Sequence, residues 1–250
     1  MKQSRSEKII ELIRENGFYM SVEKLSELLS VSKSTIRRNL QQLEKNGKVK
    51  RKYGGVEVVN ESPNLPPFSL RKHKSISEKT IIARLGASLV KNGDVIFLDG
   101  SSTACFLTNA LSEFDNLTII TNGLNNVQIL SETTLTVYTT GGKLSPTTRV
   151  AYVGQKAVDF INSMHADIAF ISALGIDENG VLYDMYDDEI AVRTAMLNNS
   201  TKKVIMLDSL KRNKIAPFKL GEINDFDYCV SDINLETFVK TKSNCTFLYD

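Results

Sequence analysis

Ser32-Lys-Ser-Thr-Ile-Arg-Arg-Asn-Leu40 is the stretch that decides the fold of the N-terminal part of the chain. Ile36 and Leu40, together with Leu43, recur at the i, i+4, i+7 spacing of the apolar face of a helix. Ser32 is a preferred N-cap residue, because its hydroxyl accepts a bond from a backbone N–H group of the first turn. We therefore predict a helix that buries its apolar face and leaves its basic side chains available to a partner.

The residues on either side of this helix extend the pattern. Periodicity predicts a first helix over residues 4–15 and a second that starts at Ser21, with only Ser30-Val31-Ser32 before the third. Residues 48–59 are first basic and then apolar, on the two sides of a Tyr53-Gly54-Gly55 turn, which predicts a hairpin. Helix, tight turn, helix and basic hairpin together predict a winged helix-turn-helix.

This layout suits binding to double-stranded DNA. Arginine forks onto guanine edges in the major groove, lysine and hydroxyl side chains reach phosphates, and a helix N-terminus favours phosphate. A small helical bundle that binds another protein is the alternative. The candidate DNA-binding residues are Ser32, Lys33, Ser34, Thr35, Arg37, Arg38, Lys50, Arg51, Lys52 and Tyr53.

Charge and composition narrow the class of protein. Residues 1–60 carry 13 Lys/Arg and 7 Asp/Glu, a net charge of +6, and the other 190 residues carry 18 and 22, a net charge of −4. A basic head on a mildly acidic body favours contact with a polyanion. No apolar run reaches the ~18 residues of a membrane span, and the first residues lack a signal-peptide core. Three scattered cysteines and two histidines predict neither a disulfide framework nor a metal site.

The chain is expected to divide near residue 60. Residues 60–68 hold three of the five prolines, and proline favours extended backbone over helix. The basic run Arg71-Lys-His-Lys74 is expected to belong to a solvated linker. We predict a DNA-binding domain over 1–59, a linker over 60–75 and an α/β domain over 76–250.

From residue 77 onward, short apolar strands alternate with helical patterns. Strands separated by helices of about ten residues imply a largely parallel sheet that is covered on both faces. Strands are predicted over 95–98, 117–121, 136–139, 167–172, 203–207 and 228–230. Helices are predicted over 78–91, 103–112, 124–131, 153–164 and 188–199.

Polar residues follow five of these strands. Asp99-Gly-Ser-Ser-Thr103 follows the first, and Asp208-Ser-Leu-Lys211 places a cation after the fifth. Parallel sheets bind ligands beyond the carboxyl ends of their strands, and backbone N–H groups at a helix start suit a phosphate. The pattern therefore favours a small anionic ligand, although Gly, Ser and Asn are also ordinary turn residues.

Both regions resemble the DeoR family of bacterial transcription regulators. In the head, the resemblance lies in the Ser32–Leu40 stretch quoted above, in Leu43-Glu44, in Gly47 and in the Arg51-Lys-Tyr-Gly-Gly55 turn. In the body, the matching segments are 99–103, Thr121-Asn122, Gly141-Gly142, Gly154, Gly175-Ile176-Asp177 and 208–211. The resemblance covers nearly the whole chain and implies a winged helix-turn-helix joined to an effector domain similar in fold to ribose-5-phosphate isomerase.

The resemblance also implies an effector site. Its phosphate would lie on residues 100–103, with Lys211 as countercharge and with Asp99, Asn122 or Asp177 meeting sugar hydroxyls. The candidate effector-binding residues are Asp99, Gly100, Ser101, Ser102, Thr103, Thr121, Asn122, Gly141, Gly142, Gly175, Asp177 and Lys211.

The leading hypothesis is a sequence-specific transcription regulator, a repressor of carbohydrate-metabolism genes that a phosphorylated sugar relieves. Its partners would be operator DNA, the phosphosugar and further copies of the chain in a homodimer or homotetramer, in the bacterial cytoplasm and away from membranes. No catalytic residue and no cofactor are expected. The alternatives are an isomerase-like enzyme, for which Asp187-Asp188-Glu189 offer carboxylates, and a constitutive DNA binder whose body only forms oligomers.

Overall fold

The computed structural model describes residues 5–15, 19–52, 55–58 and 68–250. The chain separates by its internal contacts into two compact units, Met1–Pro66 and Pro67–Asp250. Each unit has its own hydrophobic core. None of the helices in the described residues is long and apolar enough to cross a membrane.

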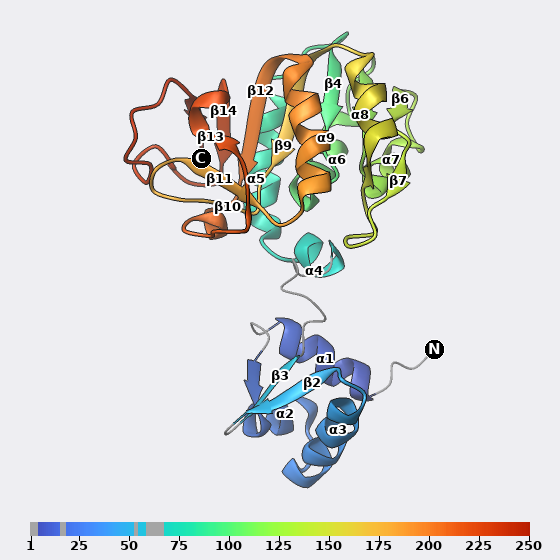
Figure 1. Cartoon of the computed structure of the whole chain (residues 1–250), viewed down its shortest axis with the longest axis vertical. Helices are drawn as coiled ribbons and strands as arrows, with labels where there is room; N and C mark the ends of the chain where they lie inside the picture. Colours follow the sequence, from blue (N-terminus) through green and yellow to red (C-terminus); the bar gives the residue numbers. More distant parts are fainter. Residues whose placement is uncertain (1–4, 16–18, 53–54, 59–67) are drawn as a thin grey trace. The chain divides into compact units, whose positions relative to one another are not determined.

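The N-terminal unit is a winged helix-turn-helix. Its elements are α1 (Arg5–Glu15), β1 (Tyr19–Ser21), α2 (Val22–Leu29), α3 (Lys33–Lys45), β2 (Val49–Lys52) and β3 (Gly55–Val58) (Figure 1). Ser21 caps α2 by accepting a bond from the Lys24 N–H at 3.1 Å, and Ser32 caps α3 by accepting one from the Thr35 N–H at 3.3 Å. The Ser32 cap and the start of the second helix at Ser21 were predicted from the sequence. Strand β1 was not predicted, and it pairs antiparallel with β3 so that the hairpin becomes a three-stranded sheet.

The centre of the C-terminal unit is a parallel sheet in the strand order β15-β14-β12-β9-β4-β5-β6. The strands are β4 (Val95–Leu98), β5 (Thr118–Thr121), β6 (Thr136–Thr139), β9 (Ala166–Ser172), β12 (Ser200–Leu207), β14 (Tyr228–Ser231) and β15 (Thr246–Leu248). Six of the seven lie where hydrophobic patterning predicts them. The short edge strand β15 was not predicted.

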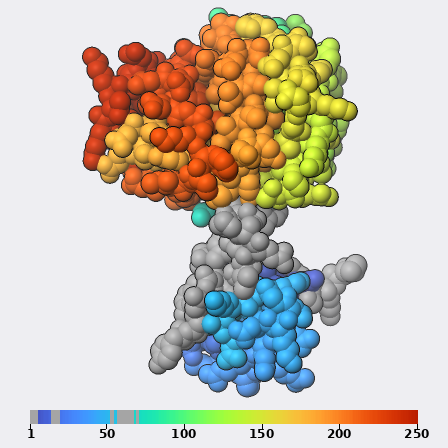
Figure 2. Space-filling model, viewed as in Figure 1, coloured from blue at the N-terminus to red at the C-terminus, as the bar shows by residue number. Residues whose placement is uncertain are grey.

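Helices cover both faces of this sheet. Helices α5 (Ile76–Ala87), α6 (Ser102–Leu111) and α7 (Leu124–Leu130) lie on one face, and α8 (Gln155–Asn162) and α9 (Asp187–Asn198) lie on the other. In Figure 2, α8 and α9 form a continuous yellow-to-orange surface. Successive residues of a strand point to opposite faces of the sheet. In β4, Ile96 and Leu98 therefore belong to the core under α6, and Phe97 belongs to the core under α8 and α9. The predicted winged helix-turn-helix and α/β fold class are therefore confirmed.

Shorter elements surround the sheet. They are α4 (Phe68–His73), β7 (Lys143–Leu144), β8 (Tyr152–Val153), β10 (Gly175–Ile176), β11 (Val181–Asp184), β13 (Phe218–Glu222), η1 (Ser209–Lys211) and η2 (Ile223–Asp225). Strands β10, β11 and β13 form a small antiparallel sheet, and β7 pairs with β8.

Helix α4 corrects one expectation about the linker. Residues 60–67 of the predicted linker lie outside the described residues, but Phe68–His73 is helical rather than extended. The reason is tertiary packing, since Phe68 is only 8% exposed and α4 packs against α6. Arg71 is half-buried, so the basic run that begins there is not simply a solvated segment.

Candidate functional site

Helix α3 presents its basic side chains to solvent, as predicted. Ile36, Leu40 and Leu43 are at most 3% exposed, whereas Arg37 and Arg38 lie on the exposed face. Among the described residues, neither arginine has a carboxylate within ion-pair distance. The two guanidinium groups are therefore available to an external anion or base edge.

The start of α3 is lined with hydroxyl groups. The Ser32 hydroxyl lies 2.8 Å from that of Ser34 and 2.9 Å from that of Thr35. Lys33 donates to Glu23 of α2 at 2.9 Å, and this hydrogen bond lowers the pKa of Glu23. The pair joins the two helices of the motif at its surface, so the Lys33 charge is already partly balanced.

The hairpin supplies the remaining predicted DNA contacts. Lys50 and Arg51 of β2 are exposed, and the backbone N–H of Arg51 donates to Glu44 Oε1 at 3.0 Å, which ties the hairpin to α3. For Lys52 only the backbone, in β2, is described. Tyr53 lies outside the described residues.

In the C-terminal unit, a buried charge cluster lies at the carboxyl end of β4. Arg193 of α9 donates to Asp99 at 2.9 Å, to Asp184 at 2.8 Å and to Glu189 at 3.2 Å. All four side chains are at most 8% exposed. Burial alone would lower the pKa of Arg193, but the three carboxylates raise it well above its ordinary value. The arginine is therefore a permanent cation that joins the β4 loop, β11 and α9.

This cluster gives Asp99 a different role from the one that the resemblance implies. Asp99 is fully buried, and its Oδ1 accepts the Ser101 N–H while its Oδ2 accepts the Ser172 N–H and Arg193. With both oxygens occupied by protein donors, Asp99 shapes the loops after β4 and β9. It has no free oxygen aimed at a sugar hydroxyl. Arg193 was missed by sequence reasoning, although its i, i+4 spacing from Glu189 is the signal of such a pair.

The loops after β4 and β5 touch each other. A Cβ on Gly100 would lie 3.2 Å from the Cα of Gly123, and a Cβ on Gly123 would lie 2.8 Å from the Cα of Gly100. Glycine is therefore needed at both positions for loop packing. The Thr121 hydroxyl accepts from the Gly123 N–H at 3.0 Å, and the Asn126 side chain donates to it at 3.0 Å.

Two buried polar atoms at these loops have no hydrogen-bond partner. Ser101 caps α6 by accepting from the Ala104 N–H at 3.0 Å, and the next residues, Ser102 and Thr103, are buried at the helix start. Thr103 Oγ1 and Asn122 Oδ1 are the buried side-chain atoms without a partner among the described residues. An unsatisfied buried polar atom costs about 1–3 kcal/mol, so two such atoms at these loops favour a site that binds a polar ligand.

Lys211 is brought to the same end of the sheet. Its Nζ donates to the Ser172 hydroxyl at 2.7 Å and to the carbonyl oxygen of Ala173. Burial lowers the pKa of Lys211, and the nearby carboxylate of Asp208 opposes that shift. No carboxylate of the described residues lies within ion-pair distance of this ammonium group. The Lys211 ammonium group can therefore still bind an anion.

Three of the other predicted effector residues have structural roles. Gly142 has φ +98°, and a Cβ there would lie 2.8 Å from the Val153 carbonyl oxygen, whereas Gly141 faces open space. A Cβ on Gly175 would collide with the backbone of Lys214. Asp177 accepts the Asn179 and Val181 N–H groups and the Tyr183 hydroxyl, so both of its oxygens hold the turn between β10 and β11.

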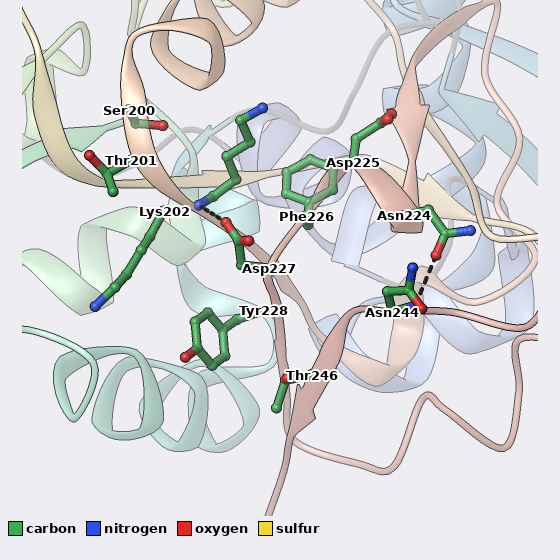
Figure 3. A pocket seen from close by; sticks show the side chains of 11 residues that line it. Ser200, Thr201, Lys202, Asn224, Asp225, Phe226, Asp227, Tyr228, Asn244 and Thr246 are labelled. Carbon is green, nitrogen blue, oxygen red and sulfur yellow. Dashed lines mark hydrogen bonds between the residues drawn. The ribbon is translucent and has the colours of Figure 1, made fainter.

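A groove of about 790 Å³ lies at the opposite end of the sheet. It is formed around the amino ends of β12 and β14, where Asp227 accepts the Lys203 N–H at 2.8 Å and Asn224 accepts the Asn244 N–H at 3.1 Å (Figure 3). Asp227 bonds to the backbone of β12, and Asn224 bonds to the backbone of the segment before β15. The groove contains none of the predicted effector residues. Among the described residues, no group of His, Cys, Asp and Glu side chains is arranged to hold a metal ion.

A winged helix-turn-helix with an exposed basic helix, joined to an α/β unit with polar strand ends, defines a DNA-binding regulator with a sensor domain. Comparisons with known families agree. Residues 5–62 match the DeoR-like helix-turn-helix domain, and residues 74–233 match the DeoR C terminal sensor domain. The chain belongs to the DeoR family of transcriptional regulators.

Relatives match over nearly the full length. The HTH-type transcriptional regulator GolR of Listeria innocua is 33% identical over 91% of this chain and 89% of its own. The glycerol-3-phosphate regulon repressor of Escherichia coli is 33% identical over 93% of this chain and 92% of its own. Both are regulators rather than enzymes, which confirms the predicted class and leaves the isomerase alternative without support. Ribose 5-phosphate isomerase A of Methanocaldococcus jannaschii shows a likeness in fold alone, with a TM-score of 0.39 and 19% identity over 54% of this chain and 53% of its own.

Proposed function

We propose that this regulator is a repressor that binds operator DNA through α3 and the hairpin, and that a phosphorylated sugar or polyol bound at the carboxyl end of the parallel sheet releases it. The observation that carries the proposal is the combination of two exposed arginines on α3 that have no ion-pair partner with a half-buried lysine, Lys211, and two unpartnered buried polar atoms in the sensor unit. The first can take a polyanion, and the second can take a small anion.

The DNA contacts divide into two kinds. Arg37 and Arg38 are proposed to reach base edges, because an arginine fork matches guanine. The hydroxyls of residues 32, 34 and 35 and the cations of the hairpin are proposed to bond phosphates, which positions the protein without reading sequence. The domain division at 1–59, 60–75 and 76–250 belongs to this proposal, with α4 as a helical part of the connecting segment.

In the effector site, the α6 N-terminus is proposed to hold the phosphate. Thr103 Oγ1 and Asn122 Oδ1 offer free hydrogen-bonding capacity, and Lys211 supplies positive charge. The relative from Escherichia coli is named for a glycerol-3-phosphate regulon, which is consistent with a small phosphorylated polyol or sugar as the ligand class. Asp99 and Asp177 are proposed to shape the site and not to touch the ligand.

Two copies of the chain are proposed to act together, as a homodimer or a dimer of dimers. DNA-binding proteins with two-fold symmetry place their recognition helices on half-sites that are about 34–36 Å apart or a multiple of that spacing. We propose that the protein binds its operator in the cytoplasm of a bacterium, because the relatives named above are bacterial.

The direct test is fluorescence anisotropy of a labelled DNA fragment from the region upstream of the protein's own gene. The panel contains glycerol 3-phosphate, ribose 5-phosphate, fructose 6-phosphate and glucose 6-phosphate, each beside its unphosphorylated form. We expect one phosphate ester to weaken DNA binding and its unphosphorylated form to have no effect. Tight binding that no compound changes would support the constitutive DNA binder instead.

Replacing Lys211 by alanine is expected to leave ligand-free DNA binding intact and to weaken the response to the effector by about tenfold or more. The reason is that a charge-assisted bond to phosphate contributes about 1.5–3 kcal/mol. The measurement is the effector concentration that half-releases the DNA. Lys202→Ala is the matched control, because Lys202 is an exposed lysine at the amino end of β12. An unchanged effector response in Lys211→Ala would remove this lysine from the site.

A further inference from the structure

Strand β6 forms one edge of the parallel sheet and lacks the features that protect most sheet edges. It is the last strand in the sheet order and lies at a border of the C-terminal unit (Figure 1). Three of its four side chains are exposed. Proteins protect such edges with charged side chains, proline or a bulge, because the unpaired N–H and C=O groups of an edge attract other strands. The sequence Thr136-Val-Tyr-Thr139 contains no charge and no proline, and its register with β5 is regular.

The other edge of the same sheet is different. Strand β15 has three residues, and the chain continues from it to Asp250, whose carboxylate forms an ion pair with Arg84 of α5. A pair of charges therefore lies close to the end of β15. Of the two edges, β6 is the one suited to receive a further strand.

The residues around β6 are also depleted of charge. Residues 116–142 include β5, α7 and β6, and they contain a single charged residue, Glu132, although 24% of the whole chain is charged. Apolar and aromatic side chains are exposed in this region, since Leu124 of α7 is 41% exposed and Tyr138 of β6 is 44% exposed. Helix α7 packs on β6. Depletion of charged residues together with exposed aromatic side chains is typical of the centre of a protein–protein interface.

The backbone of β6 determines how another strand can pair with it. The N–H groups of Thr136 and Thr140 both donate at 3.1 Å to carbonyl oxygens on the β5 side. Alternate residues of a strand bond to a given neighbour, so the N–H and C=O groups of Val137 and Thr139 point away from β5. These two residues therefore direct donors and acceptors out of the sheet.

We propose that β6 pairs antiparallel with β6 of a second copy of the chain, about a two-fold axis that passes beside Tyr138. In this register, Val137 of one copy lies opposite Thr139 of the other, and every outward N–H and C=O group of the two residues is used. The Tyr138 residues of the two copies then form a non-hydrogen-bonded pair with their Cα atoms about 4.5 Å apart. The two seven-stranded sheets become one continuous sheet.

A second copy is the occupant that this edge fits, because the edge is complementary to itself. Under a two-fold axis, the outward donors and acceptors of Val137 and Thr139 meet the acceptors and donors of the same residues. Tyr138 meets another tyrosine beside Phe160, whose ring centroid lies 6.4 Å from its own, and aromatic cross-strand pairs stabilise antiparallel strands. No side chain of β6 has a charge that would select an oppositely charged strand of another protein. The inference rests on the proposed pairing of two copies and adds the surface through which they pair.

The first experiment traps the pair as a disulfide in the full-length protein. Tyr138→Cys is expected to form a covalent dimer with oxidised glutathione, which accepts the two electrons that the two thiols lose, because the copies of residue 138 lie opposite each other. Thr136→Cys is the matched control. It is exposed on the same strand and the same face, but its two copies would lie about 13 Å apart along the strands, beyond the reach of a disulfide. The native cysteines are buried and are retained in both variants.

The second experiment removes one outward hydrogen bond from each copy. Thr139→Pro deletes an N–H group that points away from β5, so the bonds between β5 and β6 are kept. We expect the dissociation constant of the pair to rise by about tenfold or more in sedimentation velocity, or a larger assembly to fall to half its size. Thr139→Ala is the control, because it keeps the N–H group and is expected to assemble as the parent does. Circular dichroism checks that Thr139→Pro is folded, and if it is not, the cysteine variants decide.

The outcomes separate this inference from the proposed function. If the protein forms dimers or tetramers but Tyr138→Cys is not cross-linked and folded Thr139→Pro assembles as the parent does, the inference is overturned while the proposed pairing of copies stands. Equal yields of cross-linked dimer from Tyr138→Cys and Thr136→Cys would indicate random collision and would also overturn it. A protein that stays monomeric at all concentrations, with and without operator DNA, would contradict both the inference and the proposed pairing, and the proposed effector site would be unaffected.

Discussion

Replacement of Arg193 by alanine is expected to destabilise the C-terminal unit by about 3–5 kcal/mol, because it removes the guanidinium group that bonds to three buried carboxylates. Asp99, Asp184 and Glu189 would then hold negative charges away from water without the guanidinium group that they bond to. The side chain of Asp99 is fully buried, so water cannot replace the guanidinium without opening the loops after β4 and β9. The loss should therefore exceed that of an ordinary surface substitution several-fold.

The measurement is urea unfolding of the full chain, followed by circular dichroism and by hydrogen exchange in β4 and β9. Hydrogen exchange is needed because two units need not unfold in one transition. Arg84→Ala is the matched control, since Arg84 forms an exposed ion pair with Asp250 that should contribute under about 1 kcal/mol. A loss in Arg193→Ala no larger than that of the control would mean that the carboxylates are solvated and that the cluster does not hold the loops.

This cluster also shows where sequence reasoning stops. The hydrophobic periods predicted six strands of the parallel sheet and the helices other than α4, because burial of alternate or every third and fourth residue leaves a direct mark on the sequence. Of the three partners of Arg193, Asp99 lies 94 residues away along the chain, Asp184 lies 9 residues away and Glu189 lies 4 residues away. No local period records such a pairing, so only the i, i+4 contact with Glu189 was open to prediction.

The candidate effector site was predicted in part for the same reason. Parallel strands place their carboxyl ends together, so Lys211 and the β4 and β5 loops were correctly expected at one end of the sheet. Glycine is required at positions 100 and 175 because another segment of backbone lies against each of them. That segment is Gly123 for Gly100 and Lys214 for Gly175. Such crossings follow from tertiary packing and from connections that are long in sequence. Helix α4 escaped prediction because a six-residue helix has little propensity of its own and forms through its contacts with α6.

The double variant Arg37→Ala/Arg38→Ala, which removes both arginines of the proposed recognition helix, is expected to lose specific binding to the operator. A base-reading arginine contributes about 1–3 kcal/mol, or roughly 5–150-fold in affinity, and the losses add if the two residues contact separate groups. Neither side chain is needed for the fold, because both are exposed and the core of the unit is made by Ile36, Leu40 and their neighbours. The loss should therefore occur without a change in stability of the N-terminal unit.

The single variants separate base reading from phosphate contact, through anisotropy with operator and with unrelated DNA at several salt concentrations. If the arginine reads a base, its removal weakens binding to the operator and changes binding to unrelated DNA little. If it contacts a phosphate, its removal weakens binding to both DNAs and reduces the salt dependence of the affinity by about the contribution of one charge. Lys8→Ala is the control, because Lys8 is an exposed lysine on α1, outside the proposed reading surface. If the double variant binds operator as tightly as this control does, α3 is not the recognition helix and the hairpin must carry the specificity.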